Sequence, residues 1–261
     1  MKPLLLDQVK KDLHRLQLSD MVEALDSSLK EAEQDRCGYL SFLSTLLSHQ
    51  IKGRSQRSIE RRIKQAGLAR CMSFETFDWN FQPSLNVEYV KDLAQLGFIA
   101  NHQPLLILSK SGAGKTHLAN AFGIRACEAG YKVAFYTLQS LLQKLYATLA
   151  DNTTDEIISQ LTRVDLLIID ALGFIRSKPE YPSLLLDLVR AAQQRTALIL
   201  TSHISFQEWG ETIGNPSIAN AIVDRLFYKA CLITINPGLS YRTEGPHAPK
   251  VTQGDTSELS Q

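Results

Sequence analysis

The stretch LLILSKSGAGKT, residues 105–116, carries the clearest fold signal in this chain of 261 residues. It begins with four apolar residues and continues into a turn of small residues that ends in Gly114-Lys115-Thr116. A short apolar run predicts a buried strand, and residues 115–130 have helical periodicity. A turn of this composition between a strand and a helix is typical of a phosphate-binding loop.

In such a loop the backbone N–H groups surround a phosphate, and the N-terminus of the following helix adds its dipole. We expect Lys115 to meet the β- and γ-phosphates of a nucleotide and the Thr116 hydroxyl to hold Mg²⁺. Ser109 stands where the usual pattern has its first glycine. An ordinary glycine-containing turn is the alternative, but it leaves Gly-Lys-Thr at a strand-to-helix junction unexplained. The predicted nucleotide contacts are Ser109, Lys110, Ser111, Gly112, Ala113, Gly114, Lys115, Thr116 and His117.

Four more apolar runs occur along the chain, and helical patterns separate them. They cover residues 133–136, 166–169, 197–200 and 232–235. Apolar runs that alternate with helices are typical of a parallel sheet covered by helices on both faces. We therefore predict an α/β fold with a five-stranded parallel sheet.

The third run ends in Asp170 and has the form of a Walker B strand. The acid at the end of such a strand holds Mg²⁺, usually through water. An apolar run that ends in aspartate is weak evidence alone. Its position about 50 residues after the phosphate loop strengthens the prediction that Asp170, with Thr116, holds the metal.

Two further segments contain candidate catalytic residues. Ser202 and His203 follow the fourth run, where a polar group beside the loop could sense the γ-phosphate, although ordinary turn residues explain them equally well. Arg225 lies on a predicted helix and could act as an arginine finger on a neighbouring subunit. A surface salt bridge is the alternative for Arg225. With Lys115 and Asp170, these three complete the set of predicted catalytic residues.

Residues 1–70 show only helical patterns and contain a basic segment near their end. Arg54, Arg57, Arg61 and Lys64 fall on one face of a helix, which suits contact with a DNA phosphate backbone, whereas a solvated helical face is the alternative. If DNA binds the nucleotide module instead, the surface near Lys144 is the candidate. The predicted DNA contacts are Lys52, Arg54, Arg57, Arg61, Arg62, Lys64 and Lys144.

The chain therefore divides by pattern into four parts. Residues 1–70 form a helical N-terminal domain, and 71–101 form a linker that aromatic residues pack onto the next part of the chain. Residues 102–242 form the nucleotide-binding module, and 243–261 form a flexible tail.

Composition excludes several classes of protein. The net charge of +1 gives no global sign of a nucleic-acid partner, so any such signal is local. No apolar run reaches the length of a membrane helix, and the charged N-terminus does not resemble a signal peptide. The four cysteines are far apart and form no zinc or disulfide pattern. We expect a cytoplasmic protein with no membrane partner, and the family resemblance described next implies a bacterial protein associated with the nucleoid.

Taken together, these residues resemble one family. The chain is similar to the IstB-like ATP-binding helpers of bacterial insertion-sequence transposases, which are relatives of the DnaC helicase loaders and the DnaA clade of AAA+ proteins. The resemblance extends over about residues 4–242. The matching stretches include Phe81-Gln82-Pro83-Ser84-Leu85, Gly114-Lys115-Thr116-His117, Leu167-Ile168-Ile169-Asp170, Thr201-Ser202-His203, Glu208-Trp209-Gly210-Glu211, Asp224-Arg225-Leu226 and Ser240-Tyr241-Arg242.

The resemblance implies a AAA+ P-loop module preceded by a small all-α domain that contacts DNA or the transposase. It implies ATP and Mg²⁺ as cofactors, and head-to-tail assembly of identical subunits on double-stranded DNA, with Arg225 facing the nucleotide of the next subunit. The expected function is to activate or target the transposase of the same element.

Two departures from the family pattern bear on this function. Ser109-Lys110 replaces the usual start of the loop, and Ala171 replaces the acid that normally comes after the Walker B aspartate. The second departure predicts weak hydrolysis, and Glu180 and Glu208 are the acids to examine if turnover is brisk. A DnaC-like helicase loader, a non-hydrolysing DNA-binding scaffold and a small-molecule kinase are the alternatives, and the kinase lacks support because no arginine-rich lid is evident.

Overall fold

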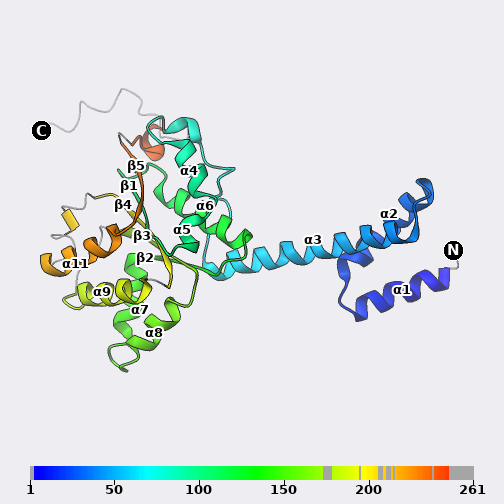
Figure 1. The fold of residues 1–261 in the computed structure, drawn as a ribbon, viewed down its shortest axis with the longest axis horizontal. Coiled ribbons are helices and arrows are strands. Elements are labelled where there is room, and N and C mark those ends of the chain that lie inside the picture. The colour runs from blue at the N-terminus through cyan, green and yellow to red at the C-terminus, as the bar shows by residue number, and fades with distance from the viewer. Residues whose placement is uncertain are drawn as a thin grey trace, which may run out of the picture. The chain divides into compact units, whose positions relative to one another are not determined.

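The computed structural model describes residues 3–172, 178–193, 195–204, 208–209, 213, 215–236 and 238–246 (Figure 1). The chain forms two units, residues 1–61 and residues 62–261. Within the described residues, no helix is both long enough and apolar enough to cross a membrane.

The first unit is entirely helical in its described part, which confirms the predicted all-α N-terminal region. Its elements are α1 (Pro3–Arg15), α2 (Ser19–Gln34) and the first part of α3 (Tyr39–Ala66). A small core holds these helices together, formed by Met21, Ala24, Leu25 and Leu46. Arg57 on α3 forms a two-pronged ion pair with Asp20 on α2, with both N–O distances at 2.6 Å.

The boundary between the units lies inside α3, at residues 61 and 62, whereas the sequence pattern places it at residue 70. The end of α3 belongs to the second unit because its side chains pack there. Arg62 donates to the backbone carbonyl of Cys127 at 2.6 Å, and Ile63 is buried. Helical periodicity continues across such a boundary, so it does not reveal where the packing partner changes.

Residues 71–101 pack as part of the second unit. They include a single 3-10 turn and two short helices, and Phe74 and Phe98 both contact the ring of Phe122 edge-on, at centroid distances of 5.0 and 6.0 Å. This agrees with the expectation that aromatic residues pack this segment onto the nucleotide-binding module. The elements are η1 (Trp79–Phe81), α4 (Val87–Leu93) and α5 (Gly97–Ala100).

The five predicted strands form one parallel sheet, as expected. Their order across the sheet is β2-β3-β4-β1-β5, so β4 lies between the strand of the phosphate loop and the strand that ends near Asp170. The strands are β1 (Leu105–Ser109), β2 (Val133–Thr137), β3 (Leu166–Leu172), β4 (Ala197–Ser202) and β5 (Cys231–Ile235).

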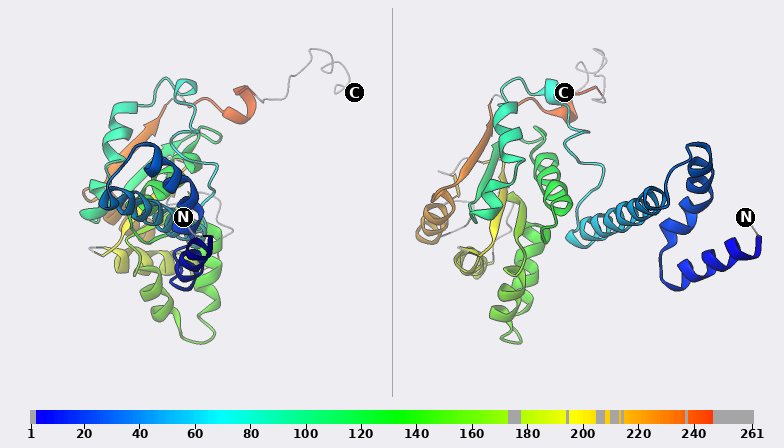
Figure 2. Two further views of the ribbon diagram at one scale, coloured as in Figure 1. Left: turned by 90° about the vertical axis from the view of Figure 1, so that its right-hand side faces the viewer. Right: turned by 45° about the vertical axis from the view of Figure 1, so that its right-hand side comes forward.

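Helices cover both faces of the sheet (Figure 2). Because side chains alternate along a strand, Leu167 and Ile169 of β3 face the cluster formed with α7, α9 and α11, whereas Ile168 lies against Gly123 of α6. The helices of this unit are α6 (Lys115–Glu128), α7 (Leu138–Ala147), α8 (Thr154–Leu161), α9 (Tyr181–Ala192), α11 (Pro216–Phe227) and α12 (Tyr241–Glu244).

Candidate nucleotide site

The predicted phosphate-binding loop joins β1 to α6, as its sequence indicates. Gly112 and Gly114 have φ angles of 82° and 95°, in the left-handed region that favours glycine. A β-carbon at Gly114 would lie 2.9 Å from the ring of Phe77, and one at Gly112 would collide with the Ser240 side chain. Both positions therefore require glycine for the backbone angle and for space.

The Lys115 side chain lies inside the loop. Its ammonium donates hydrogen bonds to the carbonyl oxygens of Ser109 at 2.7 Å and Lys110 at 2.6 Å, and only 9% of the residue is exposed. The charge is thus held beside the first residues of the turn. A phosphate bound by the loop N–H groups would meet it there.

Ser109, which replaces the usual glycine, has a structural partner. Its hydroxyl donates to the carbonyl of Ile235 at 3.0 Å and so joins the end of β1 to the end of β5. Gly238 approaches the same hydroxyl so closely that a β-carbon there would collide with it. The substitution therefore directs the Ser109 hydroxyl toward β5.

Asp170 and Thr116 come together, as predicted from their motifs. The Thr116 hydroxyl lies 3.1 and 3.0 Å from the two carboxylate oxygens of Asp170, which is 6% exposed. A carboxylate and a hydroxyl are hard oxygen ligands of the kind that Mg²⁺ takes together with phosphate oxygens and water. The pair therefore fits the predicted metal.

Thr201 is a site residue to which the sequence analysis assigned no role. Its hydroxyl donates to Asp170 at 2.5 Å and accepts from the backbone N–H of Ala171 at 2.9 Å. These bonds hold the carboxylate in one orientation from the neighbouring strand. Only the order of the strands reveals this role, because β4 must lie next to β3 for the contact to form.

Ala171 has a left-handed backbone with a φ of 61°, which is uncommon for a residue with a side chain. The register of β3 against β4 shifts between Ile169 and Leu172, and Ala171 is exposed within this irregularity. Its methyl group stands where the family pattern has an acid. The structure therefore retains the position beside Asp170 without a carboxylate on it.

Ser202 and His203 have different surroundings. The Ser202 hydroxyl is 1% exposed, donates to the carbonyl of Leu172 at 3.0 Å and accepts from the indole of Trp209 at 3.3 Å, so it ties the ends of β3 and β4 to the next loop. His203 is partly buried. Burial lowers its imidazole pKa, and the nearby Lys115 ammonium lowers that pKa further. Of the two residues, His203 is therefore the one whose pKa responds to the charge of Lys115.

His117 anchors residues 71–81 to the start of α6. Its Nε2 lies 2.8 Å from the carbonyl oxygen of Ser73 and 3.3 Å from the Thr76 hydroxyl, and its ring meets Phe77 edge-on. The sequence groups His117 with the nucleotide contacts. The structure adds that its ring holds the aromatic segment against the loop.

Two segments far apart in sequence close over the loop. The buried Gln82 amide donates to the carbonyl of Leu239 at 2.6 Å and accepts from its N–H at 3.1 Å. The next residues reach the loop itself, because the Tyr241 N–H donates to the carbonyl of Gly112 at 3.0 Å. The rings of Phe81 and Tyr241 are 4.9 Å apart. We call residues 238–244 the C-terminal strap.

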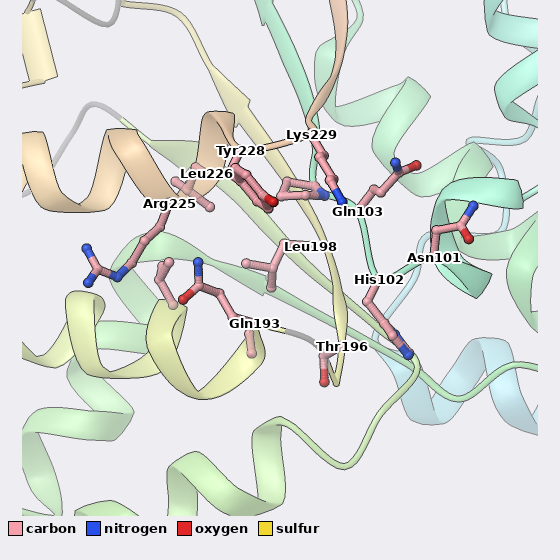
Figure 3. Close-up of a pocket in the computed structure, with 13 residues that line it drawn as sticks. Asn101, His102, Gln103, Gln193, Thr196, Leu198, Arg225, Leu226, Tyr228 and Lys229 are labelled. Atoms are coloured by element: carbon pink, nitrogen blue, oxygen red, sulfur yellow. The ribbon is translucent and has the colours of Figure 1, made fainter.

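Arg225 lies at the opposite edge of the sheet from the loop. Arg225 comes shortly before β5, at the end of the sheet where the first residue of β5 pairs with Leu105. The loop begins at the other end of these strands, where Ser109 pairs with Ile235. Arg225 lines a cavity of about 290 Å³ at this edge, with Gln193 beside it and His102 across from it (Figure 3). Its guanidinium donates to the carbonyl of Ala221 at 2.8 Å.

The predicted DNA contacts also differ in their surroundings. Arg57 forms an ion pair with Asp20, and their hydrogen bond lowers the pKa of the Asp20 carboxyl. Arg62 donates a hydrogen bond to the backbone carbonyl of Cys127. Lys144 on α7 contacts the hydroxyl of Tyr136 at 3.2 Å. The remaining predicted residues, Lys52, Arg54, Arg61 and Lys64, are exposed along α3.

Comparison with solved structures supports the fold. The chain matches DnaA of Aquifex aeolicus with bound AMPPCP at a TM-score of 0.53 and 22% identity, over 64% of this chain and 51% of that one. It matches DnaI at 0.54 and 20%, over 64% and 94%. The chain thus spans about half of the DnaA protein. At this identity the match shows the fold, which is that of a AAA+ P-loop module.

Comparison with known sequences identifies the family. The chain is 34% identical to the protein named as the ATP-binding protein of insertion sequence IS21 in Pseudomonas aeruginosa, over 95% of this chain and 93% of that one. It is 30% identical to the corresponding IS5376 protein of Geobacillus stearothermophilus, over 95% and 99%. A family model described as IstB-like ATP binding protein matches residues 11–247. The chain therefore belongs to the family of IstB-like ATP-binding proteins of insertion sequences.

Proposed function

We propose that this protein binds ATP with Mg²⁺, assembles with copies of itself on double-stranded DNA, and activates or targets the transposase of its insertion sequence. The observation that carries the proposal is the arrangement at the end of β1 and β3. A buried lysine ammonium lies inside a glycine loop, and the Thr116–Asp170 pair lies beside it. These are the groups that bind the phosphates and the Mg²⁺ of a nucleoside triphosphate.

The nucleotide contacts are inferred from these positions. The loop N–H groups and the α6 N-terminus would bind the phosphates, and Lys115 would turn from its two carbonyl partners to the β- and γ-phosphates. Thr116 and Asp170 would hold Mg²⁺, with Thr201 orienting the carboxylate. The metal supplies charge neutralisation at the phosphates. His203, which follows β4 between the two nucleotide motifs, would face the γ-phosphate.

The position of Arg225 supports assembly. A side chain at the amino-terminal edge of the sheet cannot reach the loop at the carboxyl-terminal edge of the same subunit. A second copy that docks head to tail brings the two edges together. Arg225 would then neutralise transition-state charge on the nucleotide of its neighbour, as arginine fingers do.

The first unit supports a nucleic-acid role. Its residues Lys52, Arg54 and Arg61 are exposed, and contacts between such side chains and phosphates need no particular base sequence. A contact of the transposase with this unit is part of the same proposal. The relatives are named as ATP-binding proteins of insertion sequences, which favours this function over helicase loading.

One observation favours a second candidate, a DNA-binding scaffold that binds ATP without hydrolysing it. Ala171 lacks the carboxylate that orients water in related sites, while Asp170 and Thr116 remain in place. The two candidates share ATP-dependent assembly on DNA. They differ in whether bound ATP is turned over.

The test of nucleotide binding is the affinity of Lys115→Ala for a fluorescent ATP analogue with Mg²⁺. Loss of the ammonium should weaken binding by about tenfold or more, since a hydrogen bond to a charged group contributes about 1.5–3 kcal/mol. Lys132→Ala, a lysine just before β2 and away from the loop, is the matched control and should bind normally. Equal affinity of both variants and the unaltered chain would disprove the assignment of the loop.

A further inference from the structure

A hydrolytic site needs a group that takes a proton from the attacking water, and position 171 cannot supply one. Ala171 is exposed beside Asp170, and its side chain is a methyl group. Asp170 itself accepts bonds from Thr116 and Thr201, so both of its carboxylate oxygens are engaged. Another residue at the same edge of the sheet must act if ATP is hydrolysed.

His203 occupies a suitable place. It comes directly after the last residue of β4, and β4 lies between β1 and β3. Ser202 pairs with Leu108, so His203 is level with Ser109, the residue whose carbonyl holds the Lys115 ammonium. His203 therefore extends from the strand that lies between the two nucleotide motifs. Its imidazole and the Lys115 ammonium, the cation that would bind the γ-phosphate, are near enough for their charges to interact.

A hydrogen bond joins the segments that carry Glu208 and His203. Trp209 is fully buried, and its indole donates to the Ser202 hydroxyl at 3.3 Å. Trp209 follows Glu208 and Ser202 precedes His203 in the chain, so this bond links the two segments at the same edge of the sheet. Glu208 itself is exposed, so its carboxylate is at the surface of the same edge.

The charges around the imidazole suit a proton acceptor. Burial lowers the pKa of His203, the Lys115 ammonium on α6 lowers it further, and the Glu208 carboxylate raises it. A lowered pKa keeps the ring neutral near pH 7, when it can accept a proton. The carboxylate then stabilises the imidazolium that forms, as in other histidine–carboxylate pairs.

We propose that His203, oriented by Glu208, accepts the proton of the water that attacks ATP in this protein. The inference rests on the proposed function. The water oxygen forms a bond to the γ-phosphorus, the bond from that phosphorus to the bridging oxygen breaks, and its electron pair leaves with ADP. The water proton moves to His203 and is later released to phosphate or solvent. Glu208 is a positioning residue, and His203 is the group that touches the reacting water.

The first test measures the His203–Glu208 pair without any nucleotide. NMR titration of the six histidines, with the His203 signal assigned from its absence in His203→Gln, gives the pKa of His203. Glu208→Gln should lower that pKa, because the carboxylate raises it. Glu128→Gln, at the far end of α6, is the matched control and should leave it unchanged. An unchanged pKa in Glu208→Gln would overturn the pairing.

The second test measures hydrolysis and ATP binding separately, in the full chain with duplex DNA. Both variants should bind ATP normally, whereas the turnover of His203→Gln should fall by about 10²-fold and that of Glu208→Gln by about tenfold or more. In the unaltered chain turnover should rise with pH as His203 loses its proton, and His203→Gln should lack this rise.

Three results would overturn the inference. The first is turnover in His203→Gln equal to that of the unaltered chain, and the second is Glu208→Gln turnover equal to that of Glu128→Gln. The third is an unaltered chain that binds ATP and does not hydrolyse it, which leaves the proposed ATP-dependent assembly standing. If instead the unaltered chain does not bind ATP, that result contradicts the proposed function itself.

Discussion

At the scale of single residues, the site combines two kinds of position. Lys115, Thr116 and Asp170 are residue types that their motifs require, and each lies in the expected place. The contact of Thr201 with Asp170, and the role proposed for His203, depend instead on the order of the strands in the sheet. Ala171 is the exception among the motif positions, because it has a methyl group where the family pattern has an acid.

The first prediction at this scale concerns Ala171→Glu. Ala171 already has a left-handed backbone, so a longer side chain adds little strain of that kind. A carboxylate that orients water should raise DNA-stimulated ATP turnover by about 10²-fold. The measurement is steady-state phosphate release at saturating ATP. Ala171→Gln is the control, since its amide can hydrogen-bond water but cannot take its proton. Equal gains in both variants would argue against a general base at this position.

At the scale of elements, the loop depends on two segments that flank the sheet in sequence. Residues 71–82 hold α6 through His117 and hold the C-terminal strap through Gln82. The strap in turn bonds to Gly112. Contacts with residues 71–82, α6 and the C-terminal strap therefore set the geometry of the loop together. A change in one of them should alter the affinity of the loop for the phosphates of ATP.

Gln82→Leu tests this coupling. The substitution leaves the N–H and the carbonyl of Leu239 without their partners, and each unsatisfied buried group costs about 1–3 kcal/mol. The free energy of unfolding should fall by about that amount, and the affinity for ATP should fall as well. Denaturant unfolding and nucleotide titration give both quantities. Gln95→Leu, at an exposed glutamine, is the control, and normal ATP affinity in folded Gln82→Leu would show that the strap does not shape the loop.

At the scale of the whole molecule, the candidate residues lie at two opposite edges of the sheet. The nucleotide residues gather at the carboxyl-terminal edge, and Arg225 lies at the other. In the proposed assembly, one copy would supply Arg225 and its neighbour would supply the nucleotide residues of each composite site. The first unit adds a basic surface of its own on α3.

Mixing of subunits tests the composite site. Arg225→Ala should bind ATP normally, fail to assemble in an ATP-dependent way, and lose about 10³-fold or more of its turnover, as arginine fingers contribute. A mixture of Arg225→Ala with Lys115→Ala should recover turnover, because one interface then joins an intact loop to an intact arginine. Sedimentation and phosphate release measure the two effects. Arg125→Ala, on α6, is the control, and absence of recovery in the mixture would count against a shared site.

DNA binding should be largely independent of sequence and sensitive to salt, since phosphate contacts carry it. Replacing Arg54 and Arg61 with glutamine should weaken binding to unrelated duplexes equally. Each lost phosphate contact lowers the slope of log affinity against log salt by about 0.9. The control replaces Lys11 on α1 and Lys30 on α2 with glutamine, which removes the same charge from other exposed positions. If that control weakens binding as much, or if affinity does not change with salt, the α3 surface is not the DNA site.

The local elements of this protein could be predicted from its residues alone. Apolar runs of strand length predicted all five strands, and the glycine loop with its lysine and threonine predicted the β1–α6 junction, because these signals depend on residues adjacent in the chain. The motifs also predicted that Asp170 would join Thr116.

The contacts between distant segments depended on how the whole molecule packs. Strand order brought Thr201 to Asp170 and placed His203 at the edge of the sheet where the Lys115 charge affects its pKa. Packing joined Gln82 to Leu239, 157 residues away, and moved the boundary of the helical unit into α3. These contacts depend on which elements pack side by side. The hydrophobic periodicity of one segment does not show which other segment it will pack against.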